Sequence, residues 1–390
     1  MTSSPFSNPQ FQLAVVGGGQ LGKMLVAEAR RMDISVHILD PSADAPAQFG
    51  AQSFTQGSFL DFDTVVAFGR QTSAVTIELE AVNVDALEQL EKEGIPVYPE
   101  SRVLRLLQNK PSQKDTFQKA GIPTSAYESF PSVQALHQAR ESGKWPLPFV
   151  WKIAMGGYDG FGVTIVKTEE QAQQLPVGPC LVEECVSIAL EVAVQVARHP
   201  NGTVAVYPVC DMEFHPTANQ VEFVLAPTAL SSALAAESQS LALRTLEALD
   251  MHGLLSVELF YTTDGNLLVN EVAPRPHNSG HWTLEGAATS QFEQLLRLCA
   301  DLPLGSTELL HPAAMANVVG AEGYSGPVFY EGVQELMAMP LVYLHVYGKS
   351  HTRSFRKMGH LTALGATRAE ARSRAEAARD AIRVVTSPKF

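Results

Sequence analysis

The spacing of apolar residues predicts an α/β unit at the start of the chain. A short apolar strand over 12–16 is followed by the glycine-rich turn 17–22 and by apolar residues at helical spacing to about Met32. Strands that alternate with helices predict a parallel sheet with helices on its faces. The later elements of this unit are strands over 35–39, 75–79 and 96–98 and a helix over 84–93.

The rest of the chain changes from this alternation to an α+β pattern. A helical stretch over 101–120 ends at the turn Gly121-Ile122-Pro123, and the tail 367–385 is predicted to be a surface helix capped by Thr367. Between them lie β-branched or aromatic runs, which favour strands. The predicted strands cover 149–153, 192–197, 204–209 and 221–225, and further helices cover 234–249 and 291–298.

Composition and charge limit the classes of function. A chain of 390 residues, of which 45% are hydrophobic and 18% charged, is long enough for two or three domains. The net charge of -13 disfavours nucleic acid and anionic membranes as partners, because an acidic surface repels phosphates. Without a signal-like N-terminus, the chain is expected to be cytoplasmic. Its four cysteines show no metal-like or CxxC spacing and are expected to be free thiols: Cys180, Cys185, Cys210 and Cys299.

The turn at 17–22 fits a dinucleotide fingerprint. Gly17-x-Gly19-x-x-Gly22 lies between a strand and a helix, and Asp40 follows where a ribose-binding acid would lie. Taken alone, this turn favours an NAD-dependent oxidoreductase. The remainder of the chain contains a better nucleotide site and no hydride-transfer constellation, so NAD binding is the weaker alternative.

Two lysines and a glycine-rich segment indicate a phosphate site. Lys152 lies within the apolar strand 149–153, and a lysine in that setting requires an anionic partner such as a nucleotide phosphate. Lys110 precedes the same small segment. Residues 156–162 contain four glycines and could cover a triphosphate with backbone N–H groups, although an ordinary lysine at a strand end and a flexible hairpin are the simpler alternatives.

Carboxylates later in the chain suit the other parts of a magnesium nucleotide. The strand and connection over 182–186 could meet an adenine edge, and Glu191 suits ribose hydroxyls. The turn 263–266 predicts a hairpin that brings Glu258 and Glu271 onto neighbouring strands. With the amide of Asn270, these two carboxylates form a set of hard oxygen ligands suited to Mg²⁺.

The motifs in this order resemble those of the N5-carboxyaminoimidazole ribonucleotide synthetase family of ATP-grasp enzymes. The resemblance runs from about residue 12 to 365 and rests on Gly156-Gly157-Tyr158-Asp159-Gly160, on the block 270–283, and on Tyr347-Gly348-Lys349 with 356–360. It implies an α/β pre-ATP-grasp domain over 1–103, a small lid domain over 104–190 and a larger C-terminal domain over 191–390. It also implies a homodimer.

The resemblance assigns roles to individual residues. Arg275, His277 and Lys349 would be catalytic, and the metal ligands would be Glu258 and Glu271. Tyr158, Asp159, Arg275, Lys349 and Arg356 would bind substrate. The nucleotide would be held by Lys110, Lys152, Gly157, Tyr158, Asp159, Gly160, Phe161, Gly162, Val163, Glu183, Glu184, Cys185, Val186, Glu191, His215, Asn270 and Glu271.

The implied reaction has two stages. Bicarbonate attacks the γ-phosphate of ATP to give carboxyphosphate and ADP, and the carboxyl group then passes to the 5-amino group of aminoimidazole ribonucleotide. Arg275 would hold the carbonate oxygens, His277 would transfer or orient a proton, and Lys349 with Arg356 would hold the substrate phosphate.

The chain departs from the family pattern within the glycine-rich segment. Phe161 stands where the family has a basic residue, and Val163 where it has glutamine; Ala81 replaces a polar residue after Glu80. These departures leave two alternatives beside the implied function: another ATP-grasp carboxylate–amine ligase, or a nucleotide-binding regulator with weakened catalysis.

Overall fold

The N-terminal unit is a parallel five-stranded sheet with the strand order β3-β2-β1-β4-β5. The computed structural model describes residues 6, 8, 10–156, 162–216, 218 and 220–386. The predicted elements of this unit are confirmed, and the structure adds strand β3 and helix α2. The bounds are β1 Gln12–Val16, α1 Gln20–Arg31, β2 Ser35–Asp40, a 3₁₀ turn Pro46–Gln48, β3 Ser53–Gln56, α2 Phe62–Gly69, β4 Ala74–Ile77, α3 Val84–Lys92 and β5 Val97–Tyr98.

The helix predicted over 101–120 is two helices, α4 (Ser101–Leu107) and α5 (Lys110–Lys119). Asn109 caps α5, because its side chain accepts a hydrogen bond of 3.0 Å from the backbone N–H of Ser112. Pro111, which lacks a backbone N–H, fits the first turn of the new helix. The break places Lys110 at the start of α5, and the predicted domain boundary after residue 103 falls inside α4.

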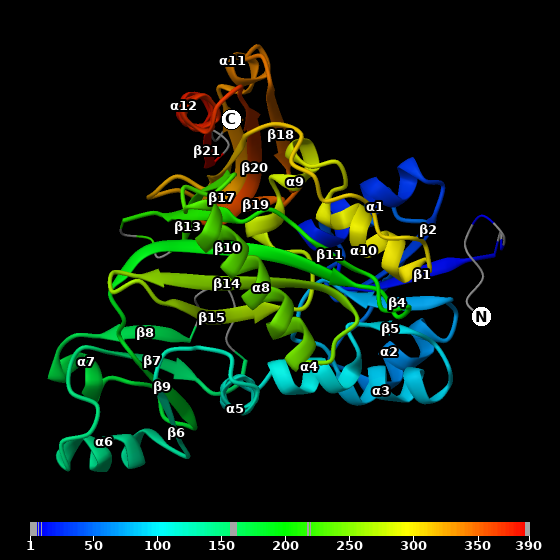
Figure 1. Ribbon diagram of the computed structural model, residues 1–390. Coiled ribbons are helices and arrows are strands. Elements are labelled where there is room, and N and C mark those ends of the chain that lie inside the picture. Colours follow the sequence, from blue (N-terminus) through cyan, green and yellow to red (C-terminus); the bar gives the residue numbers. More distant parts are fainter. Residues whose placement is uncertain are drawn as a thin grey trace.

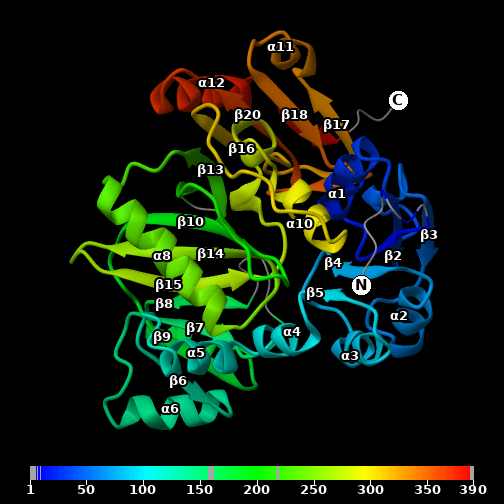
Figure 2. The same cartoon turned by 45° about the vertical axis from the view of Figure 1, so that its right-hand side comes forward.

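A small four-stranded sheet, here called the lid sheet, follows α5 in the order β6-β9-β7-β8. It lies beside strand β15 of the large sheet, with α6 on its far side (Figures 1 and 2). Its elements are β6 Tyr127–Phe130, α6 Val133–Glu141, β7 Phe149–Ile153, β8 Val163–Val166, α7 Glu169–Gln173 and β9 Cys180–Glu184.

The large sheet has nine strands, eight of them in the order β15-β14-β10-β12-β13-β16-β20-β18, while β11 pairs with β10. Helix α8 crosses the face of β10 and β14 (Figure 1). The elements are β10 Ile188–Arg198, β11 Val204–Val206, β12 Cys210–Phe214, β13 Val221–Ala226, α8 Ser232–Ala248, β14 Gly253–Thr262, β15 Leu267–Ala273, a 3₁₀ turn Asn278–Gly280, α9 Thr283–Gly286, α10 Gln291–Cys299, β16 Ala313–Val319, α11 Val333–Met337, β18 Val342–Val346 and β20 Lys357–Leu364.

The predicted tail helix is shorter than its pattern suggested. Helix α12 (Arg368–Ala381) is capped by Thr367 as expected, but the chain then forms strand β21 (Arg383–Thr386). This strand pairs with β17 (Ser325–Glu331), which also pairs with β19 (His351–Arg353). The β-branched pair Val384 and Val385 is buried there, so packing ends the helix. The alanines of α12 face the large sheet, so only part of the helix lies at the surface.

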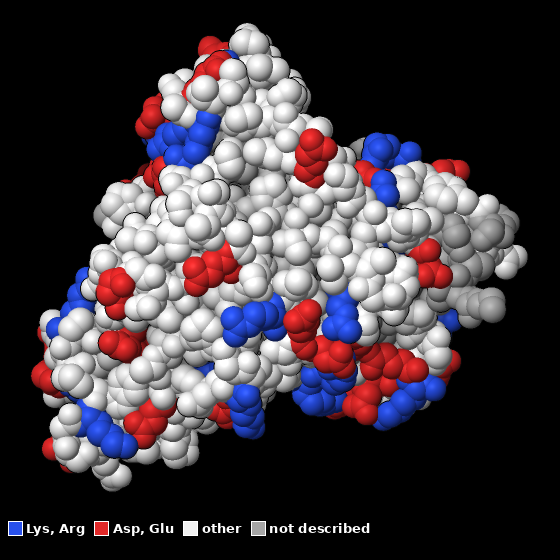
Figure 3. Space-filling model, viewed as in Figure 1, with Lys and Arg blue, Asp and Glu red and all other residues white. Residues whose placement is uncertain are grey.

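Charged side chains of both signs are mixed on the face shown in Figure 3. They are densest over the region of α3 and α4, where Arg105 contacts Asp85 at 2.7 Å and Glu88 at 2.9 Å. Within the described part of the chain, no helix is both long and apolar enough to cross a membrane.

Candidate active site

The two carboxylates proposed as metal ligands lie opposite each other in the large sheet. Glu258 of β14 pairs directly with Glu271 of β15, which confirms the predicted hairpin. The register shifts at the next pair, so that Leu259 pairs with Val269 and Asn270 is the extra residue of a β-bulge. A bulge changes the direction of a side chain, and here it adds an amide oxygen beside the carboxylates. The donor set suits a hard cation.

Metal binding stays a prediction at this pair. Among the described residues, no group of three or more His, Cys, Asp or Glu side chains is placed to hold a metal ion. Two carboxylates with an amide would suffice for Mg²⁺ only if phosphate oxygens or water supplied the remaining ligands. Burial and, secondly, the charge of Glu271 raise the pKa of Glu191 on β10 to about 7, so a cation bound beside Glu271 would favour the charged form of Glu191.

The two predicted phosphate lysines approach this hairpin from different elements. Lys110, at the start of α5, places its Nζ 3.9 Å from Glu271 Oε2. Lys152, on β7 of the lid sheet, places its Nζ 3.3 Å from Asn270 Oδ1. The structure therefore brings both lysines, Asn270 and Glu271 together where the lid sheet meets the large sheet.

The immediate anionic partner of Lys152 is a protein carboxylate. Lys152 Nζ lies 2.9 Å from Glu183 Oε1, and Lys114 Nζ lies 3.2 Å from Glu183 Oε2. Burial raises the pKa of Glu183, but the charges of Lys152 and Lys114 outweigh it and lower that pKa to about 2. Burial lowers the pKa of Lys114 to about 8. The side chain of Glu183 is therefore an internal counter-ion, and a contact between its backbone and an adenine stays a prediction.

The remaining predicted nucleotide contacts lie around this junction. Glu184 ends β9, and Cys185 and Val186 form the connection to β10, which carries Glu191. Val163 begins β8 and pairs with Lys152, while the backbone carbonyl of Gly162 accepts a 2.8 Å hydrogen bond from the N–H of Ile153. The other predicted residues of the glycine-rich cover lie outside the described residues: Gly157, Tyr158, Asp159, Gly160 and Phe161.

Arg275 and His277 lie on the segment that follows β15. Arg275 places its Nη2 2.9 Å from Glu80 of the N-terminal unit, and it donates a 3.0 Å hydrogen bond from Nη1 to the carbonyl of Pro276. His277 Nδ1 lies 3.4 Å from Glu258 Oε1 and 2.9 Å from Ser279 Oγ. The two proposed catalytic residues thus stand between the N-terminal unit and the proposed metal pair.

Lys349 and Arg356 line one pocket, as predicted for a phosphate site. The pocket has a volume of about 190 Å³, and its other wall is formed by Gly19 and the loop that contains Asp40 and Asp44. Lys349 Nζ donates a 2.8 Å hydrogen bond to the carbonyl of Lys357 and lies 5.5 Å from the ring centroid of Tyr347. The pocket therefore combines two cations from the C-terminal part with a backbone turn from the N-terminal unit.

The glycine turn is already bonded to carboxylates of the protein itself. The N–H of Gly18 donates to Asp40 at 2.8 Å, and those of Gly19 and Leu21 donate to Glu78, the latter at 3.0 Å. A Cβ on Gly19 would lie 2.4 Å from Glu78 Oε1. The N–H groups that a dinucleotide would need are taken by Asp40 and Glu78, which argues against the NAD alternative.

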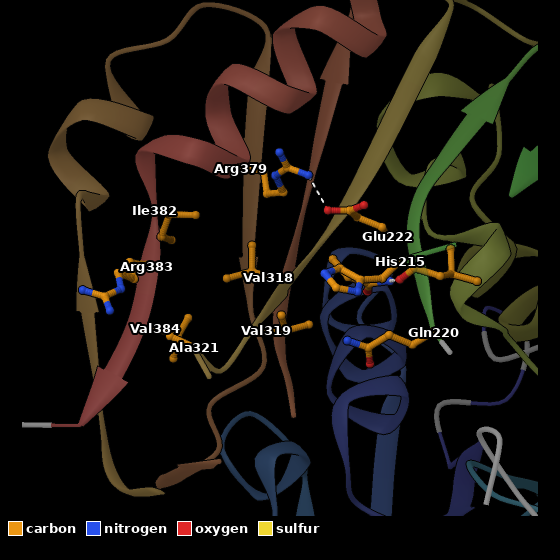
Figure 4. A pocket seen from close by; sticks show the side chains of 12 residues that line it. His215, Gln220, Glu222, Val318, Val319, Ala321, Arg379, Ile382, Arg383 and Val384 are labelled. Carbon is orange, nitrogen blue, oxygen red and sulfur yellow. Dashed lines mark hydrogen bonds and ion pairs between the residues drawn. The ribbon is translucent and has the colours of Figure 1, made fainter. Parts of the chain in front are cut away.

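His215 lies in a different pocket from the nucleotide residues described above. Figure 4 shows it with Gln220 on one side of a cavity of about 160 Å³, opposite Val384 and Arg383. Arg379 in this cavity is paired with Glu222, and the His215 ring packs edge-on against Phe355, with centroids 5.7 Å apart. The structure therefore places His215 beside the loop that carries Arg356.

The family models divide the chain into three parts. The ribonucleotide synthetase preATP-grasp domain matches residues 11–108, the ATP-grasp domain 115–292 and the phosphoribosylaminoimidazole carboxylase C-terminal domain 313–374. N5-carboxyaminoimidazole ribonucleotide synthase from Bacillus subtilis is 36% identical over 359 residues, which cover 91% of each chain. The chain belongs to the N5-carboxyaminoimidazole ribonucleotide synthase family. This confirms the resemblance and the fold class inferred from the motifs.

Solved structures of the family share the whole fold. The crystal structure of the synthetase from Thermotoga maritima has a TM-score of 0.88 and 37% identity, covering 97% of this chain and 100% of that one. The Aspergillus clavatus synthase, in complex with ADP and 5-aminoimidazole ribonucleotide, has a TM-score of 0.85 and 29% identity, covering 97% and 98%. The similarity therefore includes a relative that binds both a nucleotide and the ribonucleotide acceptor.

A stack of three imidazoles, two of them buried, links the segment that carries His277 with the strand that precedes Lys349. His281 and His360 stack with centroids 4.6 Å apart, and His345 stacks on His360 at 4.4 Å. Gln291 accepts from the N–H of His277 at 2.9 Å, which orients its amide so that Nε2 donates to His281 Nδ1. His360 Nδ1 lies 3.1 Å from the hydroxyl of Tyr347. The stack thus connects the His277 segment with the strand leading to Lys349.

The stack makes the stability of the protein sensitive to acid. Burial, first of all, lowers the pKa of both His281 and His360 well below 6.5. Below pH 6.5 the unfolded chain binds these protons and the folded chain does not. Protonation therefore favours the unfolded chain, and the free energy of unfolding falls as the pH falls below 6.5. Two such groups lower the free energy of unfolding by about 2–3 kcal/mol between pH 7 and about pH 5.5.

Urea unfolding at the two pH values tests this prediction. We expect His360→Gln to remove about half of the acid-dependent loss, because one buried imidazole no longer titrates. The exposed His311→Gln should leave the loss unchanged. An unchanged pH dependence in His360→Gln would show that His360 takes up its proton as readily in the folded protein as in the unfolded chain.

Proposed function

We propose that this chain is an ATP- and bicarbonate-dependent ligase that carboxylates the 5-amino group of 5-aminoimidazole ribonucleotide. Bicarbonate accepts the γ-phosphoryl group of ATP, and the resulting carboxyphosphate, or CO₂ released from it, reacts with the amine. The product is N5-carboxyaminoimidazole ribonucleotide, an intermediate of purine biosynthesis. Use of Mg²⁺ and a cytoplasmic homodimer belong to the same proposal.

The main support for this proposal is that the short segment from Glu78 to Glu80 joins the proposed nucleotide site to the pocket lined by Lys349 and Arg356. Glu78 bonds to the Gly19 turn, which forms a wall of the Lys349 pocket. Two residues later, Glu80 holds Arg275, which lies on the segment that follows Glu271. A phosphate held by Lys349 and Arg356 would therefore place a ribonucleotide next to the segment that meets the γ-phosphate.

The residues of the nucleotide half act chiefly by positioning and by neutralising charge. Lys110 and Lys152 would contact phosphate oxygens near Asn270. Glu258 and Glu271 would hold Mg²⁺, which when bound supplies positive charge to the transferring phosphoryl group. The pKa of Glu191, which burial and, secondly, the charge of Glu271 raise, would also be lowered by Mg²⁺ bound beside Glu271.

The acceptor half would orient the carboxyl donor and the amine. The guanidinium of Arg275, fixed by Glu80, presents planar donors suited to carbonate oxygens. His277, which is hydrogen-bonded to Ser279 and lies close to Glu258, would take or orient a proton from the attacking amine. The Arg275–Glu80 contact also joins the N-terminal unit to the reacting centre.

Phosphate release from MgATP and bicarbonate, measured with and without 5-aminoimidazole ribonucleotide, tests the proposal. We expect strong stimulation by the ribonucleotide and formation of the carboxyamino product, which chromatography or labelled bicarbonate detects. Parallel reactions with formate or amino acids in place of the two carboxylation substrates provide the control. Turnover with formate or an amino acid alone would indicate another ATP-grasp carboxylate–amine ligase.

The same assay also tests the alternative that the chain is a nucleotide-binding regulator with weakened catalysis. Its basis is Phe161, a residue without charge where the family has a basic side chain, together with Val163. ATP binding without acceptor-dependent phosphate release would favour that function. Restoring the basic residue with Phe161→Arg should then produce ribonucleotide-dependent turnover if the substitution is the cause.

A further inference from the structure

Lys114 is a buried cation that no predicted role uses. It lies on α5 with 1% of its surface exposed, and its ammonium contacts Glu183 at 3.2 Å and the hydroxyl of Ser125 at 3.3 Å. It also donates to the hydroxyl of Thr124. A lysine is seldom buried so completely without a functional or structural requirement, because desolvation of an ammonium is unfavourable.

The partner of Lys114 is also the partner of Lys152. The side chains of Lys152 and Glu183 are diagonal neighbours on one face of the lid sheet, since Val150 pairs with Glu183 and Lys152 with Leu181. α5 brings Lys114 to the same carboxylate. Two lysines and one glutamate carry formal charges of +2 and −1, so the cluster keeps a net charge of +1.

The cluster of Lys114, Lys152 and Glu183 lies next to the proposed phosphate site. Lys152 Nζ also contacts Asn270, the bulge residue next to Glu271. On the other side, the hydroxyl of Thr124 donates a 2.7 Å hydrogen bond to the carbonyl of Val269. The cluster therefore lies beside the part of β15 that would bind nucleotide phosphates. Lys152 is the member of the cluster that contacts this part of β15 directly.

We propose that Lys114 is a positioning residue for nucleotide binding, which neutralises Glu183 so that the charge of Lys152 remains available to the phosphates. Without Lys114, Glu183 and Lys152 form a neutral pair, and the attraction of Lys152 for an anion is largely cancelled. With Lys114 present, Glu183 still orients Lys152 toward Asn270 without consuming its charge. This inference rests on the nucleotide half of the proposed function.

The proposal is tested by titrating the full chain with MgADP in a calorimeter, without bicarbonate or ribonucleotide. Lys114→Met lowers the cluster charge to zero and should raise the Kd by about tenfold or more, the scale of one lost charge–phosphate attraction. The double variant Lys114→Met/Glu183→Gln has one cation and no anion. It restores the net charge of +1 and should recover most of the affinity lost in Lys114→Met, although a glutamine in place of Glu183 orients Lys152 less strongly than the carboxylate does.

Lys119→Met is the matched control, because it removes an exposed lysine from the same helix and should leave the Kd unchanged. A purely structural role for Lys114 would leave the double variant as weak as Lys114→Met, and that result would overturn the proposal. So would an unchanged Kd in Lys114→Met. If Lys114→Met does not fold, the double variant decides alone by binding MgADP with an affinity close to that of the wild type or far below it.

The titration also separates this inference from the function on which it rests. Wild-type protein that bound no MgADP would refute the nucleotide site itself and the inference with it. Wild-type binding that responds to none of the changes at Lys114 and Glu183 would refute only the role of Lys114. Because no acceptor is present, the identity of the carboxylated amine does not affect the result.

Discussion

Glu271→Ala is expected to reduce ATP cleavage by about a thousandfold or more, since it removes one of two carboxylates proposed to hold Mg²⁺ at the transferring phosphoryl group. Glu271 faces Glu258 across the β14–β15 pair and lies 3.9 Å from Lys110. The substitution therefore removes a proposed metal ligand and the ion-pair partner of Lys110 together. Phosphate release at saturating MgATP, bicarbonate and ribonucleotide measures the effect.

Folding must be separated from chemistry in this comparison. Glu271 is only partly buried, and its side chain is 41% exposed, so alanine should leave the thermal unfolding midpoint close to that of the wild type. Glu331→Ala, which shortens an exposed glutamate at the end of β17, is the control and should keep full activity. Near-normal turnover in Glu271→Ala would refute the proposed metal pair.

Local patterns in the sequence were sufficient for most of the fold and for the hairpin at the centre of the site. The four-residue turn 263–266 predicts a hairpin that puts Glu258 and Glu271 on neighbouring strands, whereas their direct pairing depends on the bulge at Asn270. The apolar runs that form β1, β2 and β7 likewise predicted strands. The order of the motifs along the chain was also sufficient to indicate the family.

Two predicted helices had the wrong bounds, for different reasons. The alanine-rich pattern of α12 extended the predicted helix over Val384 and Val385, whose burial in β21 depends on pairing with distant β17. The break between α4 and α5 is different, because Asn109 and Pro111 are start signals present in the sequence. That break could have been predicted; the strand could not.

The features that the sequence did not reveal depend on contacts between distant elements. Lys114, Lys152 and Glu183 come from α5, β7 and β9, and no spacing rule relates them. The bulge at Asn270 depends on the register of β14. Glu78 and Glu80 carried a readable signal, because they follow β4 at the carboxyl edge of a parallel sheet, where ligand sites gather.

Lys349→Ala is expected to raise the KM for 5-aminoimidazole ribonucleotide by about a hundredfold while the KM for ATP changes little. Lys349 and Arg356 line the same pocket, whose opposite wall belongs to the N-terminal unit rather than to the nucleotide residues. The loss of one ammonium should therefore weaken only the proposed contact with the ribonucleotide phosphate. Initial rates measured with each substrate varied in turn separate the two constants.

Arg353→Ala is the matched control for this prediction, because Arg353 is an exposed cation of the segment 349–357, which also carries Lys349 and Arg356, but does not line the pocket. If general attraction of a basic loop held the phosphate, both variants would raise the KM alike. If the pocket holds it, only Lys349→Ala should do so. A rise of equal size in the KM for ATP would mean that Lys349 acts on the nucleotide side, and the division of the site into a nucleotide half and an acceptor half would then be wrong.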